Sequence, residues 1–410
     1  MSSDGGEPAV APALAKRLNQ IAPSATSEMF RRVADLKAAG VPLISLAVGE
    51  PDLPPPRAVL LAAQRALDTG PFGYTQVAGL PALRAAICAR SLARRQVAHT
   101  PDGVVVSAGA KHTLFQLAQV LFDAGDEVLI PTPSWVSYAD QVRLCGATPV
   151  FVPCLAQDGF LPTPEAIARA LSPRTKALIL CSPNNPTGAA FDTAALQRLA
   201  AVLRSHSLWI IADEIYAELA YEPAGAPSLL TVAPDLRERL IIVDGVSKSY
   251  AMTGFRVGWL LGPRVVAEAC EKLQSQATTS IAAVTQLAAI AALSGDQACV
   301  AEMREIYRQR RDRFVAALRT IPGLSCQTPS GAFYVFADVR SWFGRRARAD
   351  GRVLHDDVAV VNWLLDEAQV ASVAGSAFGG PGYVRFSYAA AQQDLDAAVA
   401  RMGTAVAQLE

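Results

Sequence analysis

The sequence predicts an α/β protein with a large domain, whose mostly parallel sheet is covered by helices on both faces, and a smaller α+β domain. The first observation is that short apolar runs alternate with longer helical segments through the middle of the chain. The second is that polar, chemically capable residues gather directly after these runs, at the sheet edge where ligands bind. The third is the length of 410 residues, which exceeds one compact core and suits two domains.

The elements follow one another in a consistent order. A helical period covers about residues 27–40, and the apolar runs that predict strands of the large sheet are 104–107, 127–130, 178–181, 209–212, 240–243 and 257–261. The last third opens with a long helical pattern from about residue 302 and ends with the runs 332–336 and 384–388. We therefore expect an N-terminal arm (1–27), a small domain (28–60 with 302–410) and a large domain (61–301).

Composition excludes several classes of protein. Hydrophobic residues make up 51% of the chain and charged residues 18%, which is typical of a well-buried globular protein. The formal net charge is zero, so neither nucleic acid nor a membrane surface is expected as a partner. The seven cysteines are scattered and form no zinc motif, and we find neither a secretory signal nor an apolar run long enough to span a membrane. The expected location is the cytoplasm, and no metal is expected.

Two cationic residues follow the run at 240–243. Lys248 comes directly after a strand, where desolvation would lower its pKa and make it an amine nucleophile, although a lysine at a strand end is more often an ordinary surface residue. Eight residues later Arg256 stands among glycines and apolar residues. Its planar fork suits a phosphate or a carboxylate, with a structural salt bridge as the alternative.

Three further strand ends carry candidate residues. The stretch from Ser107 through Gly109 to Lys111 joins a strand to a helix with small residues, so it forms either a phosphate-binding turn or a plain tight turn. Asp213 emerges from a strongly apolar run, which favours a cationic partner or a helix cap, and Tyr216 can donate a hydrogen bond beside it. Asn185 lies in a loop stiffened by two prolines, which also has the composition of a structural turn.

The joint order of these motifs resembles that of the class I pyridoxal-phosphate aminotransferases, which have the aspartate-aminotransferase fold, also called fold type I. The resemblance rests on Asn-Pro-Thr-Gly from Asn185, on Asp213 with Tyr216 three residues later, and on Ser247-Lys248 with Arg256 eight residues further. It runs from about residue 23 to 409. Stretches 23–26, 47–52, 135–138, 275–280 and 330–334 resemble the bacterial aspartate/prephenate subgroup more closely.

The resemblance implies pyridoxal 5′-phosphate as cofactor and assigns roles to residues. Lys248 would form the Schiff base and shuttle the proton, Asp213 would keep the pyridine nitrogen protonated, and Tyr216 and Asn185 would bind the phenolic oxygen. Trp135 would stack on the ring. The phosphate contacts would come from Gly109, Ala110, Lys111, Ser247 and Arg256 and, across the interface of a homodimer, from Tyr74 of the neighbouring subunit.

The resemblance also implies how substrate binds. Arg385 would grip the α-carboxylate with help from the backbone of Gly49, although an arginine between apolar strand residues more often serves an internal ion pair. Trp135 and Asn185 would also face the substrate. Lys111 favours a distal carboxylate and Thr26 matches a position associated with prephenate use, so aspartate or glutamate is the expected donor. His112 and Thr113 depart from the family pattern and leave the acceptor open.

The expected activity is therefore ping-pong transfer of an amino group from an acidic L-amino acid to a 2-oxo acid such as 2-oxoglutarate. Glutamate/aspartate–prephenate transamination is an alternative, and so is a pyridoxal-phosphate-dependent lyase or oxidase on the same fold. A non-enzymatic regulatory protein is disfavoured. Only about 27 residues precede the resemblance, too few for a helix-turn-helix DNA-binding domain, and the pI gives no sign of nucleic-acid binding.

Overall fold

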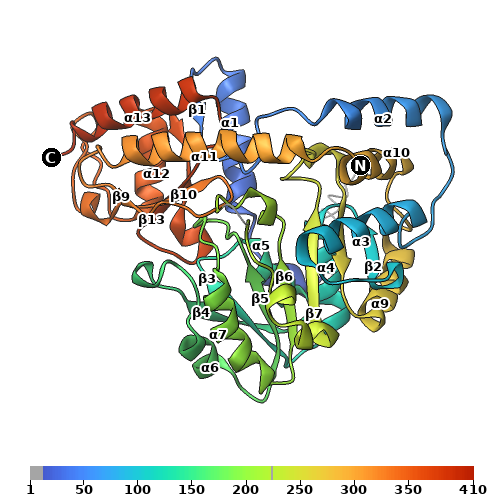
Figure 1. Ribbon diagram of the computed structural model, residues 1–410. Helices are drawn as coiled ribbons and strands as arrows, with labels where there is room; N and C mark the ends of the chain where they lie inside the picture. Colours follow the sequence, from blue (N-terminus) through green and yellow to red (C-terminus); the bar gives the residue numbers. More distant parts are fainter. Residues whose placement is uncertain (1–12, 223–224) are drawn as a thin grey trace, which may run out of the picture.

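The computed structural model describes residues 13–222 and 225–410. A seven-stranded sheet forms its centre (Figure 1), in the order β2 (Val104–Ser107), β8 (Gly258–Leu261), β7 (Leu240–Gly245), β6 (Trp209–Asp213), β5 (Thr175–Cys181), β3 (Glu127–Thr132) and β4 (Thr148–Pro153). Strand β8 runs antiparallel to both of its neighbours, and the other adjacent pairs are parallel. The predicted fold class, an α/β protein with a mostly parallel sheet, is confirmed.

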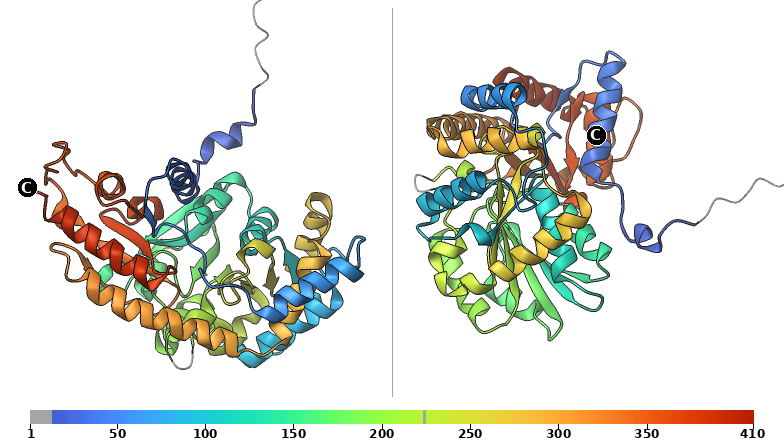
Figure 2. Two further views of the ribbon diagram at one scale, coloured as in Figure 1. Left: turned by 90° about the horizontal axis from the view of Figure 1, so that it is seen from above. Right: turned by 90° about the vertical axis from the view of Figure 1, so that its right-hand side faces the viewer.

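Helices cover both faces of this sheet (Figure 2, right) because successive strand residues point to opposite faces. Val104 and Val106 belong to one apolar cluster and Val105 to the other. The first face packs against α2 (Arg57–Thr69), α3 (Pro81–Arg95), α6 (Pro164–Ala170), α7 (Thr193–Arg204), α8 (Leu229–Val232) and α10 (Ala283–Ser294). The second face packs against α4 (Ala110–Leu121), α5 (Ser137–Leu144) and α9 (Arg264–Ala277).

A smaller antiparallel sheet forms the second centre of packing, in the order β12 (Val373–Ala374), β13 (Tyr383–Ser387), β10 (Tyr334–Asp338) and β9 (Ser325–Cys326). Its core is shared with α11 (Ala298–Leu318), α12 (Asp357–Glu367) and α13 (Gln392–Val406). Helix α11 begins beside the large sheet, where Val300 packs, and continues into the small core (Figures 1 and 2). One helix thus joins the two centres of packing.

The N-terminal part of the described chain packs with the C-terminal part. Strand β1 (Ile44–Ser45) pairs in parallel with β11 (Val370–Ala371), and Val33 of α1 (Ala25–Ala38) belongs to a cluster with Phe336 and Phe378. We propose on this basis that residues 28–60 and 302–410 form the small domain and residues 61–301 the large one. Helix α2 crosses this division, since its Val59 packs with the large sheet.

Some details differ from the sequence-based expectations, and the two-residue strands β1, β9, β11 and β12 were not predicted. Strand β4 was not predicted, because its sequence Thr-Pro-Val-Phe-Val-Pro carries prolines near both ends; it lies at the edge of the sheet, where prolines are tolerated. Helix α1 begins at Ala25, inside the expected arm, of which residues 1–12 lie outside the described part. Among the helices of the described residues, none is long and apolar enough to cross a bilayer.

Candidate active site

One cavity of about 600 Å³ collects most of the predicted site residues. It lies where the carboxyl ends of the large-sheet strands face β13 and the segment after β1. Parallel strands place the loops that follow them at one edge of a sheet, which brings together residues far apart in sequence. The predicted residues that line it are Thr26, Gly49, Ala110, Lys111, Trp135, Asn185, Asp213, Tyr216, Ser247, Lys248, Arg256 and Arg385.

Lys248 lies in the loop after β7 with its side chain in the cavity. Its Nζ donates a hydrogen bond to the carbonyl oxygen of Gly49 at 2.6 Å and lies 5.8 Å from the centre of the Tyr216 ring. Desolvation lowers the pKa of Lys248 from 10.5 to about 8, although the carboxylate of Glu50 acts in the opposite direction. About a tenth of the amine is therefore in its neutral, nucleophilic form at pH 7.

Asp213 is the last residue of β6 and is buried, with 4% of its surface exposed. Its Oδ2 accepts a hydrogen bond of 2.6 Å from the hydroxyl of Tyr138, and its Oδ1 accepts one of 3.2 Å from the backbone N–H of Ile215. Desolvation nevertheless raises the pKa of Asp213 to about 6. A cation placed beside this carboxylate would offset the cost of its burial.

Arg385 reaches the cavity from the middle of the small sheet, on β13. Its Nη1 donates to Oδ1 of Asn185 at 2.9 Å and its Nη2 to the carbonyl oxygen of Ala47 at 2.6 Å. The third nitrogen, Nε, is buried without a hydrogen-bond partner, and within residues 13–222 and 225–410 no carboxylate pairs with this guanidinium. A buried arginine with an unpaired nitrogen is a receptor for an anion.

Tyr216 lies against the small sheet. Its hydroxyl and that of Tyr334 are 2.8 Å apart, and the Arg385 guanidinium lies 4.6 Å from the centre of the Tyr334 ring. Burial raises the pKa of Tyr216 well above its ordinary value. The hydroxyl therefore stays protonated and can donate a hydrogen bond.

The turn before α4 and the loop after β7 form one corner of the cavity. Gly109 has a φ of 86°, and a Cβ on it would stand 2.6 Å from Nη2 of Arg256, so only glycine lets this arginine cross the turn. Helix α4 begins directly after this turn, so its first backbone N–H groups are those of Ala110 and Lys111. Ser247, which is buried, lines the same cavity. N–H groups at a helix start, a hydroxyl and a guanidinium suit a phosphate.

The far side of the cavity carries Lys111, Trp135 and Thr26. The Nζ of Lys111 lies 4.9 Å from the centre of the Trp135 ring, and desolvation, together with the charge of Arg256, lowers its pKa. Thr26 is half-buried near the start of α1, with its hydroxyl 2.8 Å from that of Ser24. Residues from an N-terminal helix and from the large domain thus face the same space.

Two predicted site residues do not line the cavity of the single chain, and the first is Tyr74. Its surface is 94% exposed. The next residue, Thr75, accepts a hydrogen bond of 2.8 Å on its hydroxyl from Nε2 of Gln286. Gly109 does not line the cavity either, but it shapes the turn beneath Arg256.

Sequence reasoning assigned no role to three residues that the structure places in the site: Tyr138, Tyr334 and Glu50. All three lie inside motifs that carried the family resemblance. Nothing in a local pattern indicates that Tyr138 hydrogen-bonds Asp213, 75 positions away, or that Tyr334 meets Tyr216 across the boundary between the two sheets.

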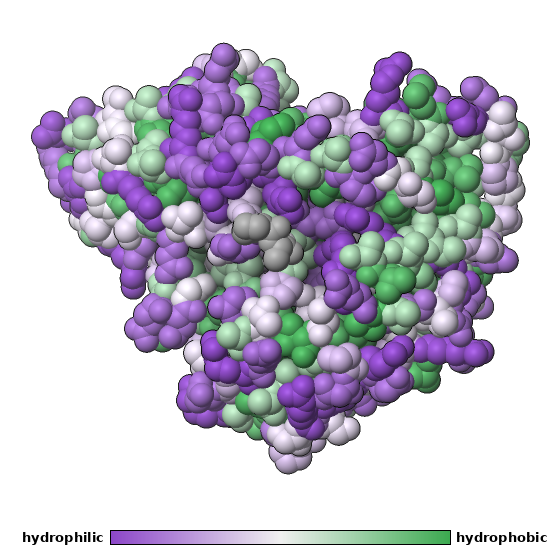
Figure 3. Space-filling view, in the orientation of Figure 1, coloured by the Kyte–Doolittle hydropathy of each residue, from purple (hydrophilic) through white to green (hydrophobic). Residues whose placement is uncertain are grey.

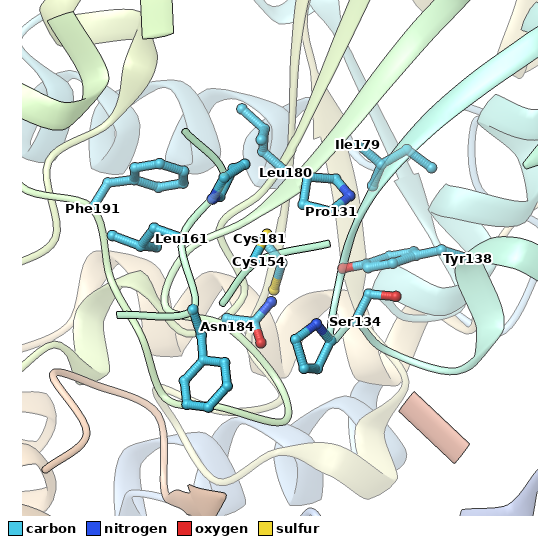
Figure 4. Close-up of a pocket in the computed structure, with 13 residues that line it drawn as sticks. Pro131, Ser134, Tyr138, Cys154, Leu161, Ile179, Leu180, Cys181, Asn184 and Phe191 are labelled. Carbon is cyan, nitrogen blue, oxygen red and sulfur yellow. The ribbon is translucent and has the colours of Figure 1, made fainter. Parts of the chain in front are cut away.

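A second cavity adjoins the first behind Tyr138 and Cys181, which line both (Figure 4). It measures about 20 Å³, and its other walls are mostly apolar, including Ile179, Leu180 and Phe191. This is room for a single water molecule, so it does not compete with the large cavity as the site of a cofactor.

Within the described residues, four cationic side chains and two carboxylates line the large cavity: Lys111, Lys248, Arg256 and Arg385, with Glu50 and Asp213. A desolvated lysine, a buried carboxylate and a phosphate-binding corner at the strand ends of this sheet define a fold type I enzyme that works through a carbonyl cofactor.

The chain belongs to the class I and II aminotransferases, whose family model matches residues 41–402. It is 43% identical to an aspartate aminotransferase of Geobacillus stearothermophilus, over 95% of this chain and 98% of the relative. It is 40% identical to an aspartate/prephenate aminotransferase of Cereibacter sphaeroides, over 95% of this chain and 97% of the relative. The structure of a Thermus thermophilus aspartate aminotransferase with maleate superimposes with a TM-score of 0.90 at 38% identity, covering 96% of this chain and 100% of that one.

Aminotransferases of this type use pyridoxal 5′-phosphate, and the residues of the cavity fit it. We propose that Lys248 would offer an amine for the aldehyde, Asp213 a buried carboxylate for the ring nitrogen, and Arg256 a cation for the phosphate. Tyr216 and Asn185 lie where hydrogen-bonding groups would face the same molecule.

The lowered pKa of Lys248 predicts how capture of the cofactor by the apoprotein depends on pH. Only the neutral amine attacks an aldehyde, so the capture rate rises about tenfold per pH unit below a pKa of about 8 and levels off above it. The measurement is the absorbance change after rapid mixing of apoprotein with pyridoxal 5′-phosphate between pH 6 and 10. The control is N-acetyl-lysine amide, a blocked amino acid in free solution, whose rate of reaction with pyridoxal 5′-phosphate should keep rising to about pH 10. A capture rate of the protein that also rises to about pH 10 would contradict the assignment.

Proposed function

We propose that this enzyme moves the amino group of an acidic L-amino acid, aspartate or glutamate, to a 2-oxo acid such as 2-oxoglutarate by a ping-pong mechanism. The observation that carries the proposal is that Lys111, Arg256 and Arg385 line one cavity without a carboxylate partner in the described part of the chain. Three unpaired cations suit three anionic groups: the cofactor phosphate and the two carboxylates of an acidic amino acid.

The three cations are assigned by their positions. Arg256 crosses the phosphate-binding turn at Gly109, which leaves Arg385 and Lys111 for the substrate. Arg385 has the unpaired Nε and sits behind Asn185, so it binds the α-carboxylate that every donor carries. Lys111, beside Trp135, binds the distal carboxylate. The Thermus thermophilus relative was solved with maleate, a dicarboxylate, which supports a substrate with two carboxylates.

The chemistry follows from what these residues do. The cofactor, when bound, supplies the electron sink that stabilises the charge left on the substrate Cα. Asp213 would hold the proton on the ring nitrogen of the cofactor, and the neutral amine of Lys248 would take the proton from the substrate Cα. Tyr216, Asn185 and Trp135 line the same cavity, where Tyr216 and Asn185 would hold the ring by hydrogen bonds and Trp135 would stack on it.

Use of prephenate as acceptor is a second candidate. Thr26 lines the cavity from α1, at the position that the resemblance associates with prephenate, and the Cereibacter sphaeroides relative is named an aspartate/prephenate aminotransferase. A lyase or an oxidase on the same fold would keep Lys248 and Asp213. Those activities release ammonia or peroxide, whereas a transaminase forms oxo acid only when an acceptor is present.

We also propose a homodimer with shared active sites, in the cytoplasm. Hydrophobic side chains gather over α2 and α3 (Figure 3), and exposed Leu61, Leu67 and Phe72 lead to Tyr74, which does not reach the cavity of its own chain. A second copy that covers this face would bring Tyr74 to the phosphate of its partner. The seven free cysteines support a reducing compartment.

A panel of half-reactions tests the function. The pyridoxal form of the enzyme is mixed with single amino acids, and conversion to the pyridoxamine form is followed by absorbance. Aspartate and glutamate are expected to convert it at least about tenfold faster than alanine or phenylalanine at equal concentration, a preference of the size one charged contact provides. Fastest conversion by a neutral donor would contradict an acidic substrate.

Changing Lys111 to alanine should remove the preference for acidic donors. The loss of one partly desolvated ion pair lowers kcat/KM for aspartate by about 10- to 100-fold and leaves alanine within about twofold. Lys111→Arg is the matched control, because it keeps the charge at the same position of α4 and should retain most of the preference. An equal loss for aspartate and alanine would exclude Lys111 as the residue that recognises the side chain.

A further inference from the structure

Six charged residues, three of them buried and three partly exposed, form a cluster on the opposite side of the large-sheet strand ends from the cavity. We call it the Arg95 cluster: Arg90, Arg94 and Arg95 of α3, with Glu214, Glu218 and Asp244. Arg95 is its centre and is only 3% exposed. Its Nε donates to Oε2 of Glu214 at 2.8 Å and its Nη2 to Oδ2 of Asp244 at 2.9 Å.

The two carboxylates that Arg95 holds have no free oxygen. Oε1 of Glu214 accepts a hydrogen bond from the hydroxyl of Ser228, and Oδ1 of Asp244 accepts one of 2.8 Å from the backbone N–H of Gly245. Arg94 donates to the same Oδ2 of Asp244 at 2.9 Å. Glu214 and Asp244 are therefore held from both sides, with 6% and 5% of their surfaces exposed.

The position of these carboxylates in the chain connects them to the active site. Glu214 directly follows Asp213, and Asp244 precedes Lys248 by four residues. The residue before Asp244, Val243, accepts a backbone hydrogen bond of 2.8 Å from the N–H of Glu214, so β6 and β7 are joined at this level. One guanidinium thus binds the strand end that carries Asp213 and the strand end that leads to Lys248.

None of the six residues lines the cavity, so the cluster acts through others. Stability alone does not explain it, because desolvation of buried ion pairs commonly cancels their attraction and apolar side chains of the same volume would serve as well. Its charges do reach the site: the carboxylates of Asp244 and Glu214 act to raise the pKa of Asp213, after the larger effect of desolvation. The three arginines offset these negative charges.

We propose that the Arg95 cluster is a positioning device that sets the spacing of Asp213 and Lys248, and the charge around them, from the far side of the sheet. Arg95, Glu214 and Asp244 are its positioning residues. The inference rests on the proposed roles of Asp213 and Lys248, and it adds residues that touch neither cofactor nor substrate.

The experiment uses the cofactor-loaded enzyme and three readouts: kcat and KM, the pKa at which the visible absorbance titrates, and the melting temperature. Glu214→Gln keeps the shape of the side chain but removes one negative charge. It also leaves one acceptor oxygen where Glu214 uses two, one for Arg95 and one for Ser228. We expect kcat to fall about tenfold or more through displacement of Asp213, with KM within twofold of the parent. We expect the spectral pKa to fall by about half a unit or more, because the unbalanced charge of Arg95 disfavours a protonated nitrogen nearby.

Arg95→Lys separates position from charge. A lysine keeps the positive charge but has no planar fork, so it cannot hold both carboxylates in their present geometry. The value of kcat should therefore fall, while the spectral pKa stays near that of the parent.

Two control variants remove a negative charge elsewhere. Glu218→Gln takes the same charge from the same cluster, but Glu218 binds Arg90 and Arg94 and lies five residues beyond Asp213 in the chain, so kcat should change by less than about threefold. Asp235→Asn breaks the exposed pair with Arg204 and should leave all three readouts unchanged.

The outcomes separate the two proposals. If Glu214→Gln and Arg95→Lys match Glu218→Gln in kcat and keep the spectral pKa of the parent, the cluster is structural only and the inference fails. If Arg95→Lys does not fold, Glu214→Gln decides alone, because it preserves the shape of the side chain. A parent enzyme without amino transfer would instead contradict the proposed function.

Discussion

Replacement of Lys248 by alanine is expected to lower kcat by at least about 10⁴-fold, because it removes both the nucleophile and the proton carrier. No other lysine can substitute: in the described part of the chain, the other lysine that lines the cavity is Lys111, which lies beside Trp135. The measurement is steady-state transfer from aspartate to 2-oxoglutarate.

The same variant should still capture part of its cofactor, because Asp213, Arg256 and the turn at Gly109 do not depend on the lysine. Bound cofactor is measured by absorbance after gel filtration. Lys272→Ala is the matched control, since Lys272 is an exposed lysine of α9 that does not line the cavity. Full activity of Lys248→Ala would remove the basis of the assignment.

Replacement of Arg385 by alanine is expected to lower kcat/KM by about 100- to 1000-fold for every amino-acid donor. Loss of one partner of a buried, hydrogen-bonded charge pair costs about 2–5 kcal/mol, and the α-carboxylate is common to all donors. Rates of the first half-reaction with aspartate, glutamate and alanine give the comparison. Cofactor binding should persist, because Arg385 contacts Asn185 and Ala47 and lies away from the phosphate corner.

Arg385→Lys keeps a charge but loses the fork, so it should fall between the parent and the alanine variant. Arg340→Ala, which removes an exposed guanidinium paired with Asp338, should leave the rates unchanged. A loss for aspartate alone would move Arg385 from the α-carboxylate to the side chain of the substrate. Together with Lys111→Ala, the two variants distinguish recognition of what all donors share from recognition of what acidic donors add.

Much of the site could be predicted because its residues follow strands. Asn185, Asp213 and Lys248 each come at or soon after the end of an apolar run, and a parallel sheet brings such positions to one edge whatever the details of packing. The strands themselves were recognisable from their apolar, buried character. Strand β4 was not, because an edge strand is half exposed and tolerates proline, so its pattern is weak.

Contacts between distant segments could not be predicted in the same way. Arg385 meets Asn185 from 200 positions away, and Lys248 meets Gly49 from 199 positions away. These contacts depend on how the small sheet packs against the edge of the large one. No local periodicity encodes that arrangement.

The sequence by itself determined the fold class, because strand alternation is a local property of the chain. It indicated the candidate reacting groups through the residues after each strand and through the family that their joint order resembles. Only the tertiary structure decided their partners: the unpaired Nε of Arg385, the hydroxyl of Tyr138 on Asp213, and the Arg95 cluster behind the sheet. Burial and the charges of remote neighbours set pKa values and positions, and both arise only when the folded chain excludes water and brings those neighbours together.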